Sequence, residues 1–217
     1  MNIAEKSVLT VIFGSVLPIL LFLVGWWASF RMVQESMIVV FAASGLVVGI
    51  LIDALFLRKW FQKPYQTSTK VLILIYLFYS AGIFGFFMGI PVFNLITGLA
   101  AGIFTGRKAR LNHENINEFN SKIVKVSTFT SVIMVIICIF SAAIALHDPS
   151  DTARNLEGMF RMQPFTITTA MIIGIILIGG ILLALLQYWL TRQAALAAFG
   201  IRKQALSILL RKNREVK

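Results

Sequence analysis

The sequence predicts an all-α, multi-pass membrane protein with six transmembrane helices and with its N and C termini both in the cytoplasm. Three observations support this fold class. The 217-residue chain is 58% hydrophobic and only 13% charged, whereas about a quarter of the residues of a soluble domain are charged. Its uncharged segments are as long as membrane spans. Its basic residues are concentrated between alternate segments, as the positive-inside rule expects.

The first uncharged segment, Val8 to Phe30, is longer than the ~20 residues that cross the hydrocarbon layer. A signal peptide is the alternative interpretation. The segment exceeds the usual hydrophobic region of a signal peptide, and the sequence Gly-Trp-Trp-Ala-Ser at 25–29 is a poor cleavage site. We therefore interpret it as the first transmembrane helix.

The uncharged stretch from Val71 to Gly106 has 36 residues, which is too long for one untilted crossing and sufficient for two short ones. Gly89-Ile90-Pro91 is the natural break, because proline disfavours helix at the preceding residue and begins a new helix well. One kinked helix is the alternative. The expected spans are 8–30, 37–57, 71–88, 91–106, 126–146 and 165–190.

The distribution of Lys and Arg favours two crossings over one kinked helix. With a crossing on each side of Pro91, 17 of the 20 basic residues share one face of the membrane, and only Arg31, Arg154 and Arg161 lie on the other. A single kinked helix would remove this asymmetry. The basic face is then cytoplasmic. The net charge of +11 is explained by orientation and by attraction to anionic lipid, so we expect no nucleic-acid partner.

Two segments outside the spans have their own patterns. After Asp148-Pro149-Ser150-Asp151, apolar residues recur at helical spacing and predict a short amphipathic helix on the outer surface. Residues 191–217 form a basic amphipathic cytoplasmic tail, with Gly200 as a possible bend. The tail could lie on the inner leaflet or bind a membrane or cytosolic protein.

Polar residues inside the spans are the candidates for a binding site. Asp53 is the one ionisable group in a span, although it could instead pair with Arg58 or Lys59. Asn94 lies in the first turn after Pro91, where a helix start exposes backbone amides, and it could equally cap the helix or bond between helices. Thr97 follows one turn later. These three residues are our predicted ligand-binding side chains.

Glycines at every third or fourth position predict close helix packing, the usual device in lipid. One series of glycines lies along the fourth predicted span, another lies along the third, and a shorter one lies in the second. We expect these residues to form a tight cluster of the second, third and fourth helices. They are Gly98, Gly102 and Gly106; Gly82, Gly85 and Gly89; and Gly45 and Gly49.

Enzymatic and metal chemistry have little support. The chain lacks the HExxH, GxSxG and GxxxxGK[ST] motifs. Its one cysteine, Cys138, lies in an apolar run and excludes an internal disulfide or a CxxC site. His113 and Glu114, in an asparagine-rich connector, do not make a metal ligand set. We expect no cofactor, no metal and no catalytic residue.

We therefore expect an integral membrane protein, of a prokaryotic plasma membrane, that serves as a solute-binding or transport component. In helix number and size it is similar to the substrate-binding membrane subunits of energy-coupling-factor vitamin transporters, a resemblance that supplies no binding residues. The alternative is a non-catalytic subunit or scaffold that docks a partner through its basic cytoplasmic face. A membrane-embedded enzyme that modifies lipid is the third hypothesis.

Overall fold

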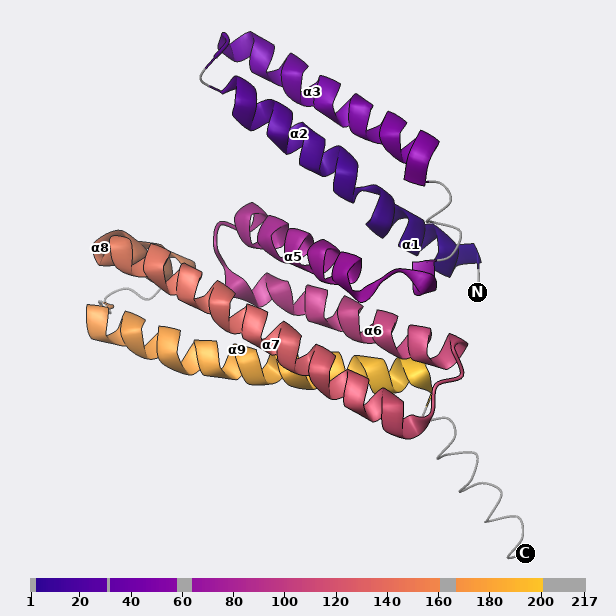
Figure 1. Cartoon of the computed structure of the whole chain (residues 1–217). Helices are drawn as coiled ribbons and strands as arrows, with labels where there is room; N and C mark the ends of the chain where they lie inside the picture. Colours follow the sequence, from indigo (N-terminus) through magenta and orange to yellow (C-terminus); the bar gives the residue numbers. More distant parts are fainter. Residues whose placement is uncertain (1–2, 31, 58–63, 161–166, 201–217) are drawn as a thin grey trace, which may run out of the picture. The chain divides into compact units, whose positions relative to one another are not determined.

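The computed structural model describes residues 3–30, 32–57, 64–160 and 167–200, all numbered as in the sequence. Helices account for the regular structure of these residues, and no strand occurs among them. The elements, which Figure 1 shows, are α1 (Ile3–Gly14), α2 (Val16–Ser29), α3 (Glu35–Ile52), the π-helix η1 (Asp53–Leu57), the 3-10 helix η2 (Pro64–Gln66), α5 (Thr69–Phe86), the 3-10 helix η3 (Pro91–Asn94), α6 (Leu95–Leu111), α7 (Ile116–His147), α8 (Pro149–Phe160) and α9 (Thr169–Phe199).

Five helices of the described chain are long and apolar enough to cross a membrane. They cover Ser7–Ser29, Glu35–Leu55, Thr69–Phe86, Ile116–His147 and Thr169–Phe199. The all-α class of a multi-pass membrane protein is therefore confirmed, whereas the count of six and the placement of the termini stay predictions. The remaining predicted span falls on α6, which has 17 residues and buries Thr97, three glycines and Ala109.

The chain divides into two compact units, Met1–Phe78 and Tyr79–Lys217, with α5 passing from one to the other. In the first unit α1 and α2 form a broken helix. The break falls at Gly14–Ser15 because Pro18, four residues after Gly14, has no N–H to donate to the Gly14 carbonyl. The Tyr65 hydroxyl donates to the Glu5 carboxylate and links η2 to α1.

In the first unit α2 and α3 pack so closely that three glycines have no room for a side chain. A Cβ atom added at Gly25 would lie 2.6 Å from the Phe41 carbonyl oxygen, and one at Gly49 would lie 2.5 Å from the Pro18 Cα. At Gly45 it would overlap the Leu21 carbonyl oxygen. Ala42, on the same face of α3, is completely buried.

The second unit is a bundle of α6, α7 and α9. Figure 1 shows α6 and α9 running in the same direction, with α7 antiparallel to both. At the end where α6 and α9 finish, Phe119 of α7 stacks on Phe199 of α9 with ring centroids 4.1 Å apart. Ala109, Ile123 and Ala195 pack around this pair.

The glycines of α6 face α9, which corrects the predicted cluster of the second, third and fourth helices. A Cβ atom at Gly102 or Gly106 would overlap the carbonyl oxygen of Thr191 or of Ala195, respectively, and one at Gly98 would overlap the Gln187 side chain. Gly45 and Gly49 face α2 instead. Apart from chain neighbours and the backbone of the same helix, no atom of the described chain lies within 4 Å of a Cβ position at Gly82 or Gly85. The sequence shows which helix face is smooth, but it does not show which helix covers that face.

The predicted break at Gly89-Ile90-Pro91 is confirmed, and the single kinked helix is wrong. α5 ends at Phe86, and the chain turns through Met88 and Gly89, whose φ angles are +53° and +83°. The Gly89 amide donates to the Phe84 carbonyl at 2.8 Å, and the Met88 amide donates to that of Gly85 at 3.2 Å. This pair of bonds is a Schellman motif, which ends a helix.

Met88 therefore occupies a left-handed position that costs a non-glycine residue about 1–2 kcal/mol. Because its side chain is 90% exposed, little packing is lost on truncation. We expect Met88→Gly to raise the free energy of unfolding by about 1 kcal/mol. Gly89→Ala should lower it by a similar amount, since φ is positive and the Ile144 side chain lies 3.3 Å from the added Cβ. Equilibrium unfolding in detergent measures both, and effects of equal sign would contradict the motif.

The predicted amphipathic helix after residue 148 is α8, and Asp148 caps it. Its Oδ1 atom accepts from the Asp151 amide at 3.0 Å and from the Ser150 hydroxyl at 2.9 Å. The Asp151 bond is the main reason that the pKa of Asp148 is lowered, and the Ser150 bond adds to it. Because the folded-state pKa is lowered, the cap contributes stability above the ordinary carboxyl pKa and loses it as the pH falls.

α6 also ends in a Schellman motif, in which the Glu114 amide donates to the Ala109 carbonyl at 3.1 Å and His113 has a φ of +51°. Next to it, the Glu114 carboxylate pairs with the Lys122 ammonium at 2.8 Å. At the same end of the bundle, Gly200 terminates α9 at a φ of +96°, where the sequence suggested a bend. α9 passes residue 190 without interruption, and residues 201–217 of the predicted tail lie outside the described residues.

Candidate functional site

Seven polar side chains are buried inside the second unit. They come from four segments of the chain: the end of α5, η3 with α6, α7 and α9. Each is at most 7% exposed, so the interior of this apolar bundle is polar over several turns. We call this set the polar core: Ser80, Asn94, Thr97, Ser127, Thr130, Gln187 and Thr191.

Helical spacing places these groups inside the bundle. On α7, Ser127 and Thr130 share a buried face with Met134 and Ile137, at intervals of three or four residues. On α9, Gln187 and Thr191 are one turn apart, and Asn94, at the end of η3, lies three residues before Thr97 of α6. Residues three or four apart lie on one face of a helix, so each helix contributes a short polar stripe.

Hydroxyl groups join the helices within the polar core. The Thr130 and Thr191 hydroxyls are 3.0 Å apart and connect α7 to α9. The neighbouring Ser131 hydroxyl donates to the Ala184 carbonyl at 2.8 Å. The Ser80 hydroxyl donates to Thr97 at 3.4 Å, and the Thr97 hydroxyl donates to the Asn94 carbonyl at 2.7 Å. These bonds link α5 to α6 and, separately, α7 to α9.

Gly98 makes room for the Gln187 amide. A Cβ atom added at Gly98 would overlap the amide group of the Gln187 side chain and would lie 2.7 Å from the Thr191 hydroxyl oxygen. Gln187 is completely buried. A side chain at position 98 would therefore displace an amide from the centre of the bundle, and glycine here positions a polar group as well as allowing two helices to approach.

Asn94 is the residue of the polar core whose side chain has the most unmade hydrogen bonds among the described residues. Its side chain is 1% exposed, and neither its amide nitrogen nor its amide oxygen has a hydrogen-bond partner among the described residues. The Ser127 hydroxyl is in the same state. Leaving a buried polar group unpaired costs about 1–3 kcal/mol. The Asn94 amide can donate two hydrogen bonds and accept two, and its side chain uses none of them among the described residues.

The structure brings two of the three predicted binding residues together, because Asn94 and Thr97 both belong to the polar core. Asp53 belongs to the first unit, where its side chain is 8% exposed at the start of the π-helix η1. The sequence reasoning missed Gln187, Thr191, Ser127 and Thr130. A signal was present, since Gln187 is the one amide side chain in the uncharged stretch 165–190, and such residues face other helices.

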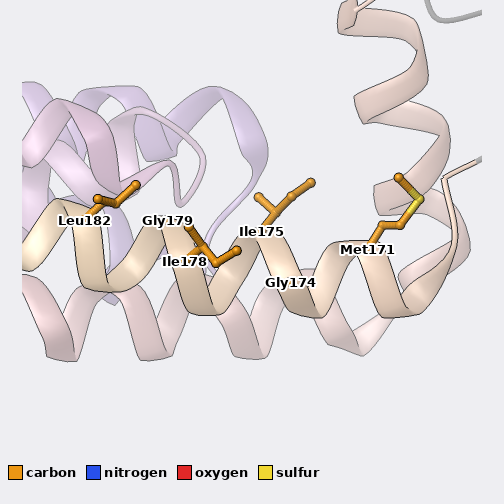
Figure 2. A pocket seen from close by; sticks show the side chains of 6 residues that line it. All are labelled: Met171, Gly174, Ile175, Ile178, Gly179 and Leu182. Atoms are coloured by element: carbon orange, nitrogen blue, oxygen red, sulfur yellow. The ribbon is translucent and has the colours of Figure 1, made fainter.

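A shallow apolar groove follows one face of α9, away from the polar core. Figure 2 shows its lining, which comes from this helix alone: Met171, Gly174, Ile175, Ile178, Gly179 and Leu182. The side chains are aliphatic or a thioether and offer no hydrogen-bonding group. The groove suits hydrocarbon and carries no recognition chemistry for a polar ligand.

No three His, Cys, Asp or Glu residues of the described part of the chain gather as a metal site. Comparisons with protein-family models, with curated proteins and with solved structures found no significant match.

Proposed function

We propose that this chain is a solute-binding or transport component of a membrane, and that its polar core holds the ligand. The observation that carries the proposal is the Asn94 side chain, which is 1% exposed and has both polar atoms unpaired among the described residues. A polar group that is expensive to bury unpaired in lipid points to a binding role. The surrounding helices are apolar, so the ligand that fits best combines a hydrogen-bonding group with a mainly apolar body.

We also propose six crossings with cytoplasmic termini. The uncharged part of η3 and α6 covers 91–106, a path of about 24 Å at helical rise, and a span of this length is accommodated by local thinning of the bilayer and by flanking basic side chains that reach the interface. The basic residues of the second unit support the orientation. Arg107, Lys108, Arg110, Lys122, Lys125 and Arg192 lie where α6 and α9 approach their C-terminal ends and α7 begins, and the positive-inside rule places that end in the cytoplasm.

A scaffold that docks a partner is the second candidate. It is favoured by the hydroxyl bonds between Thr130 and Thr191 and between Ser131 and Ala184, which are typical of polar residues that hold helices together in lipid. On this hypothesis the polar core is structural. A lipid-modifying enzyme has less support, because the groups of the polar core are amides and hydroxyls, with no carboxylate or imidazole to act as a base.

Asn94→Leu distinguishes binding from structure. In the absence of ligand we expect this variant to be as stable as the wild type or more so, because it removes a buried amide without a partner. Affinity for the ligand should fall about 10- to 100-fold, which corresponds to about 1–3 kcal/mol for the lost hydrogen bonds. Asn120→Leu, on an exposed turn of α7, is the matched control.

The measurement has two parts. Mass spectrometry of the purified protein identifies a co-purifying small molecule, and thermal shift tests a panel of vitamins and lipids. Wild type and Asn120→Leu should retain the compound and respond to it, whereas Asn94→Leu should do neither. An equal response in all three proteins, or a marked loss of ligand-free stability in Asn94→Leu, would contradict the proposed site and favour the scaffold.

A further inference from the structure

Three lysines gather where α6 ends and α7 begins, at the basic end of the second unit. The Lys122 ammonium pairs with the Glu114 carboxylate at 2.8 Å. Lys108, in the last turn of α6, is close enough for its charge to interact with both of these groups. Lys125 lies three residues after Lys122, on the same side of α7. We call these three side chains the lysine cluster: Lys108, Lys122 and Lys125.

The lysine cluster holds like charges near one another. Burial is the main reason that the pKa of Lys108 is lowered; the Glu114 carboxylate raises this pKa, and the Lys122 ammonium lowers it again. Because the pKa is lowered overall, the positive charge of Lys108 is less stable in the folded chain than in water. The Lys122 side chain is 53% exposed, and Lys125 is exposed as well. An anion that binds at the exposed side of the cluster offsets the repulsion between the ammonium groups.

The cluster lies at the depth of the lipid headgroups. The uncharged part of α7 begins at Val126, and the helix rises about 1.5 Å per residue, so Lys125 and Lys122 lie about 1.5 Å and 6 Å beyond it. The headgroup layer on each side of a bilayer is about 5–7 Å thick. Glu118 lies one turn further from the membrane than Lys122, beyond this layer. A phosphate in the headgroup layer therefore meets lysines before it meets the exposed carboxylate.

An apolar face of α7 leads from the cluster into the membrane. Val132 and Ile136 lie seven and eleven residues after Lys125, on the same face two and three turns along the helix. Their side chains are 50% and 42% exposed. A hydrocarbon chain that lies along this face places the phosphate of the same molecule beside the lysines. This continuity favours a phospholipid over a free anion in solution.

We propose that the lysine cluster binds the phosphate of one anionic phospholipid of the inner leaflet, with an acyl chain along the face of α7 that carries Val132 and Ile136. Basic groups between transmembrane helices on the cytoplasmic side bind acidic headgroups. A general attraction of a basic protein to anionic lipid follows total charge, whereas this site depends on particular lysines. The choice of leaflet rests on the orientation proposed above, and the site is independent of ligand binding in the polar core.

Native mass spectrometry of the full chain, released from micelles that contain equal amounts of dioleoyl phosphatidylglycerol and dioleoyl phosphatidylcholine, tests the site. The wild type should retain one phosphatidylglycerol after phosphatidylcholine is lost. Lys108→Gln and Lys125→Gln should each weaken binding about five-fold, the contribution of one basic residue near a membrane surface. Arg192→Gln, which removes the same charge at an exposed position of α9, is the matched control and should bind normally.

Glu114→Gln gives a prediction of opposite sign. The carboxylate neutralises Lys122 and repels a phosphate, so its replacement by an uncharged side chain of the same shape should strengthen phosphatidylglycerol binding about five-fold. A cluster that only joins α6 to α7 would lose stability in this variant without any gain in lipid binding. Thermal unfolding in neutral micelles, measured beside the lipid titration, separates the two results.

Equal losses in Lys125→Gln and Arg192→Gln would contradict the site, because binding would then follow total charge. Equal retention of the two lipids by the wild type would contradict it as well. A third sample contains inorganic phosphate in place of phosphatidylglycerol, and an equal, Lys108-dependent stabilisation by that ion would assign a free anion and exclude the lipid. If Lys108→Gln or Glu114→Gln does not fold, the comparison of Lys125→Gln with Arg192→Gln, both at exposed positions, still decides the question.

Discussion

Gly102→Ala is expected to destabilise the second unit by about 2 kcal/mol, although alanine is the better helix former. The added methyl group would overlap the Thr191 carbonyl oxygen and lie 2.9 Å from the Ala194 Cβ. Neither obstacle is the flexible end of a side chain, so α6 and α9 must separate. Overpacking of this kind costs about 1–3 kcal/mol or more, against a gain of about 0.5–1 kcal/mol in helix propensity.

Gly179→Ala on α9 is the matched control for this prediction. No atom outside its own helix backbone and chain neighbours lies within 4 Å of a Cβ at Gly179 in the described structure, so the same substitution should be neutral or stabilise by up to about 1 kcal/mol. Equilibrium unfolding of the full chain in mixed micelles compares the two variants. Similar effects at positions 102 and 179 would mean that α6 does not pack on α9 through its glycines.

Gly45→Ala should have a comparable effect on the first unit. Its methyl group would overlap the Leu21 carbonyl oxygen and lie 2.9 Å from the Leu21 carbonyl carbon, so α2 and α3 cannot keep their present distance. We expect a loss of about 2 kcal/mol. Hydrogen exchange should rise in the α2 and α3 amides and stay unchanged in α7 and α9, because the two units are separately compact.

Val47→Ala is the control on the same helix. Val47 is 54% exposed, and a side chain that faces lipid contributes little to helix association. Its effect should be below about 0.5 kcal/mol. Exchange that rises equally in both units after Gly45→Ala would show instead that they unfold as one.

The sequence predicted the elements well because the signals are local. Pro91 and Gly89 end one helix and begin the next through their own backbone preferences, and Asp148 caps α8 by a bond that reaches three residues. The helices that pack against the glycine-lined faces could not be predicted, since a helix face lined by small residues can pack against any other such face. That Gly98, Gly102 and Gly106 meet α9 depends on the complementary small residues Thr191, Ala194 and Ala195, which lie about 90 residues away.

Only part of the candidate site was predicted, because a local sequence signal marks only some of its residues. Asn94 and Thr97 were identified because they are close to the break at Pro91, whereas Gln187 and Thr191 belong to a long helix without any local irregularity. Ser127 and Thr130 resemble the many small hydroxyl residues that spans tolerate. The alternation of buried and exposed positions along α7 and α9 identifies these residues only when the neighbouring helices are known.

Whether α5 and α6 are two separate crossings is the central question for the membrane arrangement. A cysteine-free chain, made by Cys138→Ala, accepts single cysteines at exposed positions 88, 117 and 150. Labelling of intact cells with an impermeant thiol reagent should modify Met88→Cys and Ser150→Cys, and should modify Asn117→Cys only after the cells are opened. Equal labelling of positions 88 and 117 in intact cells, with position 150 protected, would show that α6 does not cross and would contradict the six-helix account.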